Sequence, residues 1–250
     1  MTLHRILSWT PAAVVFDCDG TLLDTERHWE TARRRVLDDV GLTPAAGFAE
    51  RAKGLHYTEC GQLMADEGGR PELGADLADR LLRHFRALVC EHPVIMPGAR
   101  DLVRAAAAFA PLAVASNCPR DVVEPGLEEA GLLRHFRAVV VPEGTIRPKP
   151  DPDVYLTAAQ LCGADPADTL AVEDTHCGIL AAVRAGLTVL GAGPWPGEET
   201  TALTDLWVET LEDPRIIRWA TERTPLRTSP PKPAAAPSPT GSGLQQATAP

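Results

Sequence analysis

Val14-Val15-Phe16-Asp17-Cys18-Asp19-Gly20-Thr21 is an apolar run that ends in two carboxylates and is then broken by a glycine and a threonine. A buried strand that ends in this way brings Asp17 and Asp19 to the edge of a sheet. There the two carboxylates are close enough to share a divalent cation, and a carboxylate can itself act as a nucleophile. The stretch therefore predicts phosphoryl chemistry at the end of the first strand.

Short apolar runs recur after this one and alternate with helical patterns. Each run is bounded by turn or polar residues and is rich in Val, Ala and Leu, which is typical of strands buried on both faces of a parallel sheet. The predicted strands are Ala12–Phe16, Leu112–Ala115, Ala138–Val141, Leu170–Val172 and Leu187–Leu190. The predicted helices between them are Gly98–Phe109, Pro119–Ala130, Pro152–Leu161 and Gly178–Ala185. This alternation predicts an α/β fold with a doubly wound parallel sheet.

One insertion interrupts the alternation. Residues 25–93 contain no convincing strand and are broken by glycines and prolines into helical stretches. These stretches are Glu26–Val40, a segment around Phe48–Lys53, Tyr57–Asp66 and Ala75–Cys90. We therefore expect a small helical domain over residues 25–93, inserted into an α/β core formed by residues 1–24 and 94–222.

The last stretch, residues 223–250, differs in composition from the rest. It consists largely of Pro, Ala, Ser, Thr and Gly, with almost no large apolar residues. Such a segment buries too little surface to offset its ordering entropy, so we expect a disordered tail. The alternative is a docking peptide, because Pro230-Pro231-Lys232-Pro233 is compatible with a polyproline II helix.

Charge and cysteine usage exclude some classes of protein. The 250 residues carry a formal net charge of -10, which argues against a basic nucleic-acid-binding face. The six cysteines form no CxxC pair, and the N-terminal residues lack the apolar run of a secretory signal. No run approaches the length of a membrane span. We expect a cytoplasmic protein with reduced thiols and no nucleic-acid or membrane partner.

Three further polar motifs end predicted strands, where open α/β sheets bind ligands. They are Ser116-Asn117, Lys149 in a proline-flanked loop, and Glu173-Asp174. A phosphoryl group attacked by a carboxylate needs its charge offset, which a metal and a lysine can do. Mg²⁺ prefers carboxylates and water, a serine can donate a hydrogen bond to phosphate, and a lysine supplies a point charge.

Each motif alone also has an ordinary structural explanation. Asp-x-Asp-Gly occurs in turns and helix caps, and a serine after a strand is commonly an N-cap. A proline-flanked lysine is usually solvated, and Glu-Asp before a helix favours the helix dipole. It is their joint occurrence, in order and at successive strand ends, that favours a phosphoryl-transfer site.

In the order and spacing of these motifs the sequence resembles the haloacid dehalogenase (HAD) superfamily over roughly residues 12–211. The match includes Asp24-Thr25 and Pro97-Gly98, and the helical insertion resembles the C1 cap of the β-phosphoglucomutase-like and phosphoglycolate-phosphatase-like branch. The resemblance implies Mg²⁺ as cofactor and an aspartyl-phosphate on Asp17, with Asp19 as general acid and base.

The resemblance also implies roles for the remaining motif residues. Asp17, the backbone carbonyl of Asp19, and Asp174 would ligate Mg²⁺, with Glu173 supporting the metal's water. Phosphate would be held by Ser116, Asn117 and Lys149, and Thr21 would brace the first loop.

Asp19 discriminates between activities within the resembled superfamily. Dehalogenases lack this second aspartate, so its presence favours phosphoryl transfer. In β-phosphoglucomutases an Arg follows a Lys-Gly pair in the cap, but here Tyr57 stands at that position. Those mutases also carry a His where this sequence has Trp29, and both departures favour a phosphatase.

The sequence therefore predicts a Mg²⁺-dependent phosphatase of a small phosphorylated metabolite, acting as a monomer or weak dimer. A phosphomutase is the alternative, and a non-catalytic HAD-like binding module is a remote one. Specificity would lie in the cap, with candidates His28, Trp29, Lys53, His56 and Tyr57.

Overall fold

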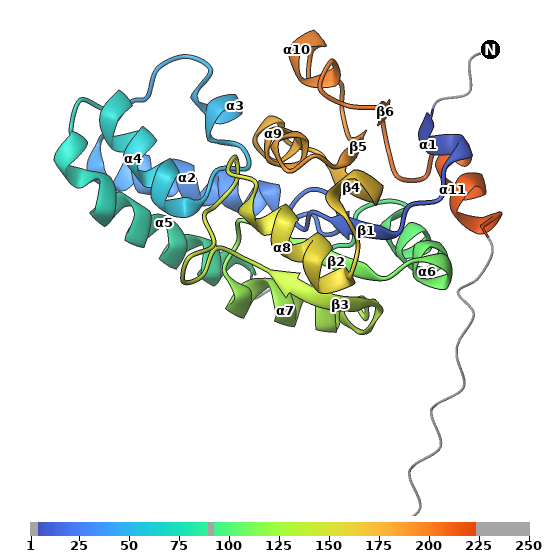
Figure 1. The fold of residues 1–250 in the computed structure, drawn as a ribbon. Coiled ribbons are helices and arrows are strands. Elements are labelled where there is room, and N and C mark those ends of the chain that lie inside the picture. The colour runs from blue at the N-terminus through green and yellow to red at the C-terminus, as the bar shows by residue number, and fades with distance from the viewer. Residues whose placement is uncertain (1–4, 90–92, 224–250) are drawn as a thin grey trace, which may run out of the picture.

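Six parallel strands form one sheet at the centre of the computed structural model (Figure 1), which describes residues 5–89 and 93–223. Apart from Arg223, the predicted tail lies outside the described residues. The strands are β1 (Ala13–Phe16), β2 (Leu112–Ala115), β3 (Phe136–Val140), β4 (Thr169–Glu173), β5 (Thr188–Ala192) and β6 (Leu206–Val208). The five predicted strands are present, with ends shifted by at most two residues, and the sequence prediction missed β6.

The strand order is β3-β2-β1-β4-β5-β6, so the chain moves outward from β1 first in one direction and then in the other. Phe16 of β1 is in register with Val114 of β2 on one side and with Val172 of β4 on the other. The reversal of strand order beside β1 is the switch point at which such sheets bind ligands. The predicted doubly wound α/β fold is confirmed.

Helices cover both faces of the sheet and bury its side chains. On one face lie α1 (Arg5–Ser8), α6 (Ala99–Phe109), α7 (Arg120–Glu129) and α11 (Pro214–Thr221); on the other lie α8 (Asp153–Cys162) and α9 (His176–Arg184). A short α10 (Glu198–Thr201) follows β5, and single 3-10 turns occupy Pro71–Leu73, Leu133–His135 and Pro166–Asp168. Every residue of β1, β2, β4 and β5 is buried, which explains why these strands are continuous apolar runs.

Helices account for the regular structure described between β1 and α6. They are α2 (Glu26–Val40), α3 (Phe48–Ala52), α4 (Tyr57–Glu67) and α5 (Gly74–Val89), seen at the left of Figure 1. We call residues 25–93 the cap segment. The Trp29 ring of α2 stacks on Phe85 of α5 with 3.6 Å between centroids and 9° between planes. This contact joins the first and last cap helices through apolar surface.

The two chain passages between the cap segment and the sheet run side by side. The Asp24 backbone N–H donates to the Val94 carbonyl at 2.8 Å, and the Met96 N–H donates to Leu22 at 2.9 Å. The division into a core and a cap at residues 24 and 94 stays a prediction. No helix among the described residues is long and apolar enough to cross a membrane.

Candidate active site

Predicted motif residues lie at the ends of three neighbouring strands, at one edge of the sheet. Asp17 follows β1 and Ser116 follows β2, while Glu173 is the last residue of β4. The Asp17 backbone N–H donates to the Val172 carbonyl at 2.9 Å, so the parallel pairing of β1 and β4 continues into the motif. Asp17 and Glu173-Asp174 therefore meet because their strands are adjacent, as their position after apolar runs predicted.

A buried lysine lies at the centre of this edge. Lys149 Nζ is 2.5 Å from Asp17 Oδ1 and 2.7 Å from Glu173 Oε1, and only 1 % of Lys149 is exposed. Burial alone disfavours the ammonium, but the two carboxylates outweigh it and hold the pKa of Lys149 well above its usual value. The second oxygen of Asp17, Oδ2, is buried and has no hydrogen-bond partner. An unpartnered buried carboxylate oxygen is costly, and this one is available to a ligand.

Glu173 is the most heavily hydrogen-bonded carboxylate of the site. Its Oε1 accepts from Lys149 and from the Tyr155 hydroxyl, the latter at 3.3 Å. Its Oε2 accepts from the Asp174 N–H at 2.8 Å, the Thr175 N–H at 2.7 Å and the Thr175 hydroxyl at 3.0 Å. Five donors fix Glu173, which fits a supporting residue better than one that exchanges ligands.

Asp19 is held by two hydroxyls rather than by a cation. Ser116 Oγ donates to Asp19 Oδ2 at 3.0 Å, and the Thr25 hydroxyl donates to Asp19 Oδ1. Ser116 Oγ also accepts the Cys118 N–H at 2.9 Å. Burial raises the pKa of Asp19 above its ordinary value although these hydrogen bonds oppose the rise. A raised pKa makes a carboxyl group a better proton acceptor and suits it to general acid and base catalysis.

The Asn117 side chain forms hydrogen bonds with both the lysine loop and the cap segment. Its Oδ1 accepts the Lys149 N–H at 2.8 Å, and its Nδ2 donates to the Lys149 carbonyl at 3.1 Å. The same Nδ2 donates to the Gly54 carbonyl of the cap segment at 3.0 Å. Asn117 therefore positions the lysine loop and contacts the cap segment at once.

Lys53 is the predicted cap residue that the structure brings into contact with the motif carboxylates. Its Nζ lies 2.9 Å from Asp174 Oδ2, while the Thr21 hydroxyl donates to Asp174 Oδ1 at 3.2 Å. Burial raises the pKa of Asp174 to about 7, which the Lys53 ammonium opposes and Glu173 reinforces. Thr21 thus contacts the acidic motif, consistent with the bracing role expected for it.

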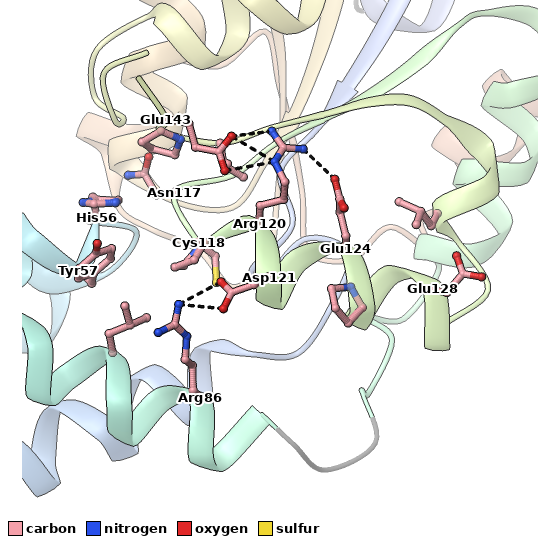
Figure 2. A pocket seen from close by; sticks show the side chains of 16 residues that line it. His56, Tyr57, Arg86, Asn117, Cys118, Arg120, Asp121, Glu124, Glu128 and Glu143 are labelled. Carbon is pink, nitrogen blue, oxygen red and sulfur yellow. Dashed lines mark hydrogen bonds and ion pairs between the residues drawn. The ribbon is translucent and has the colours of Figure 1, made fainter. Parts of the chain in front are cut away.

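The other predicted cap residues line three different cavities around the site. His56 and Tyr57 begin α4 and line a separate cleft that also includes Asn117 (Figure 2). His28 lines a third cavity, of about 330 Å³, together with Asp19. Trp29 is buried against Phe85 and also lines the small cavity of about 30 Å³ beside Asp17.

The carboxylates fit a hard divalent cation. Oxygen atoms of Asp17, Glu173 and Asp174 lie within 4.8 Å of one another, all in buried side chains. Asp17, which belongs to this group, has the unpartnered oxygen Oδ2, and oxygen donors are what Mg²⁺ prefers. The Asp19 carboxylate lies outside the group, so only its backbone carbonyl remains a predicted ligand.

Sequence reasoning assigned no role to several residues that shape the site. Tyr155 and Thr175 hold Glu173, Thr25 holds Asp19, and the partly buried pair Arg33–Glu26, with 2.5 Å between its atoms, lines the same small cavity. Thr25 ends the first motif and Thr175 directly follows Glu173-Asp174, so their positions in the sequence could have indicated the site. Nothing in the spacing of Tyr155, Glu26 and Arg33 points to it, because their helices are placed there by tertiary packing.

The chain belongs to the haloacid dehalogenase-like hydrolases, since the model of that hydrolase family matches residues 11–186. It is 28% identical over 217 residues to β-phosphoglucomutase of Bacillus subtilis (strain 168), covering 80% of this chain and 94% of that protein. It is 27% identical over 220 residues to validoxylamine A 7'-phosphate phosphatase of Streptomyces hygroscopicus subsp. limoneus, covering 82% of this chain and 95% of that protein. The relatives thus include both a mutase and a phosphatase.

Solved structures share the fold. A crystal structure of β-phosphoglucomutase from Clostridium difficile superimposes with a TM-score of 0.73 and 21% identity, covering 85% of this chain and 98% of that one. The resemblance to the superfamily stated from the motifs is therefore confirmed, and the arrangement of sheet and helices agrees with it.

Proposed function

We propose that this protein is a Mg²⁺-dependent phosphatase that hydrolyses a small phosphomonoester through an aspartyl-phosphate on Asp17. The observation that carries the proposal is the unpartnered, buried Oδ2 of Asp17, whose other oxygen is held by Lys149. A nucleophile needs one fixed oxygen and one that is accessible to the electrophile. The phosphatases among the relatives, and the family itself, support the same reaction class.

In this proposal Asp17 Oδ2 forms a bond to phosphorus while the bond from phosphorus to the substrate oxygen breaks. Asp19 protonates that leaving oxygen and then takes a proton from water, whose oxygen attacks phosphorus and releases Asp17 and inorganic phosphate. Lys149 and Ser116 hold the phosphoryl oxygens. Asp17, Asp174 and the Asp19 carbonyl would bind Mg²⁺, which would neutralise phosphate charge.

Glu173 and Asn117 act as positioning residues in the proposed mechanism. Glu173 shares Lys149 with Asp17 and so keeps the ammonium beside the nucleophile. Asn117 holds both backbone groups of Lys149 and the Gly54 carbonyl. We further propose that residues 25–93 act as a cap, with Lys53 contributing its charge at the metal end of the site.

A phosphomutase is the second candidate, because one relative is a β-phosphoglucomutase. The two activities differ in the fate of the phosphoryl group, which water takes in a phosphatase and a sugar hydroxyl takes in a mutase. Incubation with a hexose 1-phosphate separates them. A phosphatase releases inorganic phosphate, whereas a mutase forms the 6-phosphate and releases none.

Replacement of Asp17 tests the proposed nucleophile. Asp17→Asn keeps the shape of the side chain but removes the attacking carboxylate, so phosphate release from p-nitrophenyl phosphate with Mg²⁺ should fall by at least about 10³-fold. Asp101→Asn, in the first turn of α6, is the matched charge control and should keep wild-type activity. Circular dichroism should show that both variants are folded. An Asp17→Asn enzyme with a tenth of the wild-type rate would contradict the mechanism.

A further inference from the structure

A large cleft adjoins the small cavity beside Asp17. It has a volume of about 690 Å³ and lies between the cap segment and the sheet domain, and Figure 2 shows it. We call it the distal cleft; on the cap side it is lined by the start of α4 and by α5, and on the other side by α7 along its length, from Arg120 to Glu128, and by the loop after β3. Asn117 and Cys118 line both the distal cleft and the small cavity. A phosphoryl group at Asp17 would therefore leave the rest of its molecule beside the distal cleft.

An observation independent of the distal cleft points to a ligand in the small cavity beside it. Asp17 Oδ2 is buried and unpartnered in the small cavity, whose volume of about 30 Å³ is that of a single water. That space cannot enclose an entire phosphomonoester. The leaving group must extend into a neighbouring cleft, and the chemistry of that cleft then selects it.

The distal cleft carries more negative than positive side chains. Its ionisable residues are the carboxylates Asp121, Glu124, Glu128 and Glu143 and the guanidinium groups of Arg86 and Arg120. His56 adds no positive charge at neutral pH, because burial lowers its pKa to about 4.

Both arginines of the distal cleft form ion pairs with carboxylates of the same cleft. Arg120 Nη1 is 2.7 Å from Glu124 Oε1, and Arg120 Nη2 is 3.1 Å from Glu143 Oε2. Arg86 Nη2 is 2.8 Å from Asp121 Oδ2, and Figure 2 shows both sets of ion pairs. Glu128 has no ion-pair partner among residues 5–89 and 93–223. An anionic leaving group would have to displace these pairs, whereas a cation would meet uncompensated carboxylates.

A second cleft, which shares Glu26 and Arg33 with the small cavity, has a similar balance. It has a volume of about 810 Å³ and includes five carboxylates, His176 and the three cationic side chains of Arg and Lys residues. Each of the three cations contacts a carboxylate: Arg33 with Glu26, Arg51 with Glu67, and Lys53 with Asp174. Both arginines that line this second cleft are therefore paired with carboxylates, and Lys53 lies at the proposed metal end of the site and does not line the distal cleft.

Resting on the proposed phosphatase function, we infer that the substrate is the phosphomonoester of an amine-bearing alcohol, whose ammonium group occupies the distal cleft. Glu128 and the carboxylates around Arg120 are the specificity-determining residues. The same charges disfavour a bisphosphate or a phosphorylated carboxylic acid.

The test compares esters that differ in the charge of the leaving group. Phosphoethanolamine is paired with phosphoglycolate, and glucosamine 6-phosphate with 6-phosphogluconate, each with Mg²⁺. We expect kcat/KM to favour the amine of each pair by at least about tenfold, and the preference to shrink in 0.5 M salt because partly exposed charges are screened. Each compound is also measured as a competitive inhibitor of p-nitrophenyl phosphate hydrolysis, so a compound that binds without being cleaved still reports the preference.

Two variants assign the preference to the distal cleft. Glu128→Gln should lower the amine-to-acid ratio by about threefold, and Glu124→Gln with Glu143→Gln should release Arg120 and lower it further. Glu209→Gln, exposed and outside both clefts, is the matched control and should leave the ratio unchanged.

The outcomes separate this inference from the proposed function. Equal or better use of the acids, or a ratio that none of these variants changes, overturns the amine assignment while the phosphatase stands. If p-nitrophenyl phosphate and all four esters release no phosphate, both the function and the inference fail.

Discussion

Glu173 shows how a single residue organises the site. It is completely buried and accepts hydrogen bonds from a lysine, a tyrosine, a threonine hydroxyl and two backbone N–H groups. A buried carboxylate is tolerated only when its oxygens are paired in this way. The arrangement also needs space on the adjacent helix: Gly178 of α9 packs against Glu173 so closely that any Cβ would overlap the carboxylate.

Gly178→Ala tests this close packing. Alanine is the better helix former, but its methyl group would displace Glu173, and overpacking of this kind costs about 1–3 kcal/mol. We expect the free energy of unfolding to fall by that amount in urea titrations, and phosphate release to fall with it because Lys149 loses its second carboxylate.

Gly126→Ala in α7 is the matched helical control for that prediction. A Cβ there would lie 3.1 Å from a Leu23 methyl group, which can shift. This variant should change the free energy of unfolding by less than about 1 kcal/mol. Equal behaviour of the two variants would show that Gly178 is not needed for Glu173.

The residues that carry charge could be predicted from the sequence, and most of their partners could not. Asp17 and Glu173-Asp174 end apolar runs, and parallel strands necessarily bring their carboxyl ends to one edge. Tyr155 lies in the first turn of α8, where its spacing is that of any buried helical residue. Its contact with Glu173 depends on how α8 crosses β1, β2 and β3, which no local pattern encodes.

At the scale of elements, α4 begins with a titratable cap. His56 is the N-cap residue, and its Nδ1 accepts the Thr58 backbone N–H at 3.4 Å and contacts the Thr58 hydroxyl at 2.7 Å. Only the neutral ring can accept at Nδ1, and burial lowers the pKa of His56 to about 4 from 6.5. A depressed folded-state pKa gives stability that is complete above pH 6.5 and is lost as the pH falls through 4.

His56→Asn tests this pH dependence. Asparagine caps a helix at any pH, so the variant should lose less stability on acidification. Between pH 7.5 and pH 4 we expect the wild type to lose about 1–2 kcal/mol more unfolding free energy than the variant, after allowance for partial solvent exposure. Urea unfolding at both pH values measures the difference. Parallel losses in the two proteins would show that His56 does not titrate in this window.

The elements that the sequence prediction missed have weak local signals. Strand β6 has three residues and lies at the sheet edge, where Trp207 packs flat against Gly191 of β5. A run that short is below the length at which periodicity is informative. Helix α11 does have a start signal in Asp213-Pro214, an N-cap aspartate followed by proline, which could have been used. The interior strands were predictable because burial on both faces makes them continuously apolar.

At the scale of the whole molecule, one tight loop of the cap segment contacts the motif residues of the sheet domain. Lys53 pairs with Asp174, and the Gly54 carbonyl accepts from Asn117. Gly54 has φ of +74°, and a Cβ at this position would lie 2.7 Å from the Thr175 hydroxyl oxygen. Glycine is therefore required twice, for its backbone conformation and for its approach to Thr175.

Gly54→Ala tests whether this contact is needed for activity. The methyl group would push the loop away from Thr175, so Asn117 and Asp174 would lose their cap partners. We expect kcat/KM for p-nitrophenyl phosphate to fall at least about tenfold, because misplacement of a reacting group by 1 Å can lower the rate 10²-fold.

Gly41→Ala is the matched control: Gly41 has φ of +65° but nothing lies within 4 Å of the added Cβ. Both variants should lose about 1 kcal/mol of stability from backbone strain, and only Gly54→Ala should lose activity. Equal activity in the two variants would show that catalysis does not depend on this contact between the cap segment and the sheet.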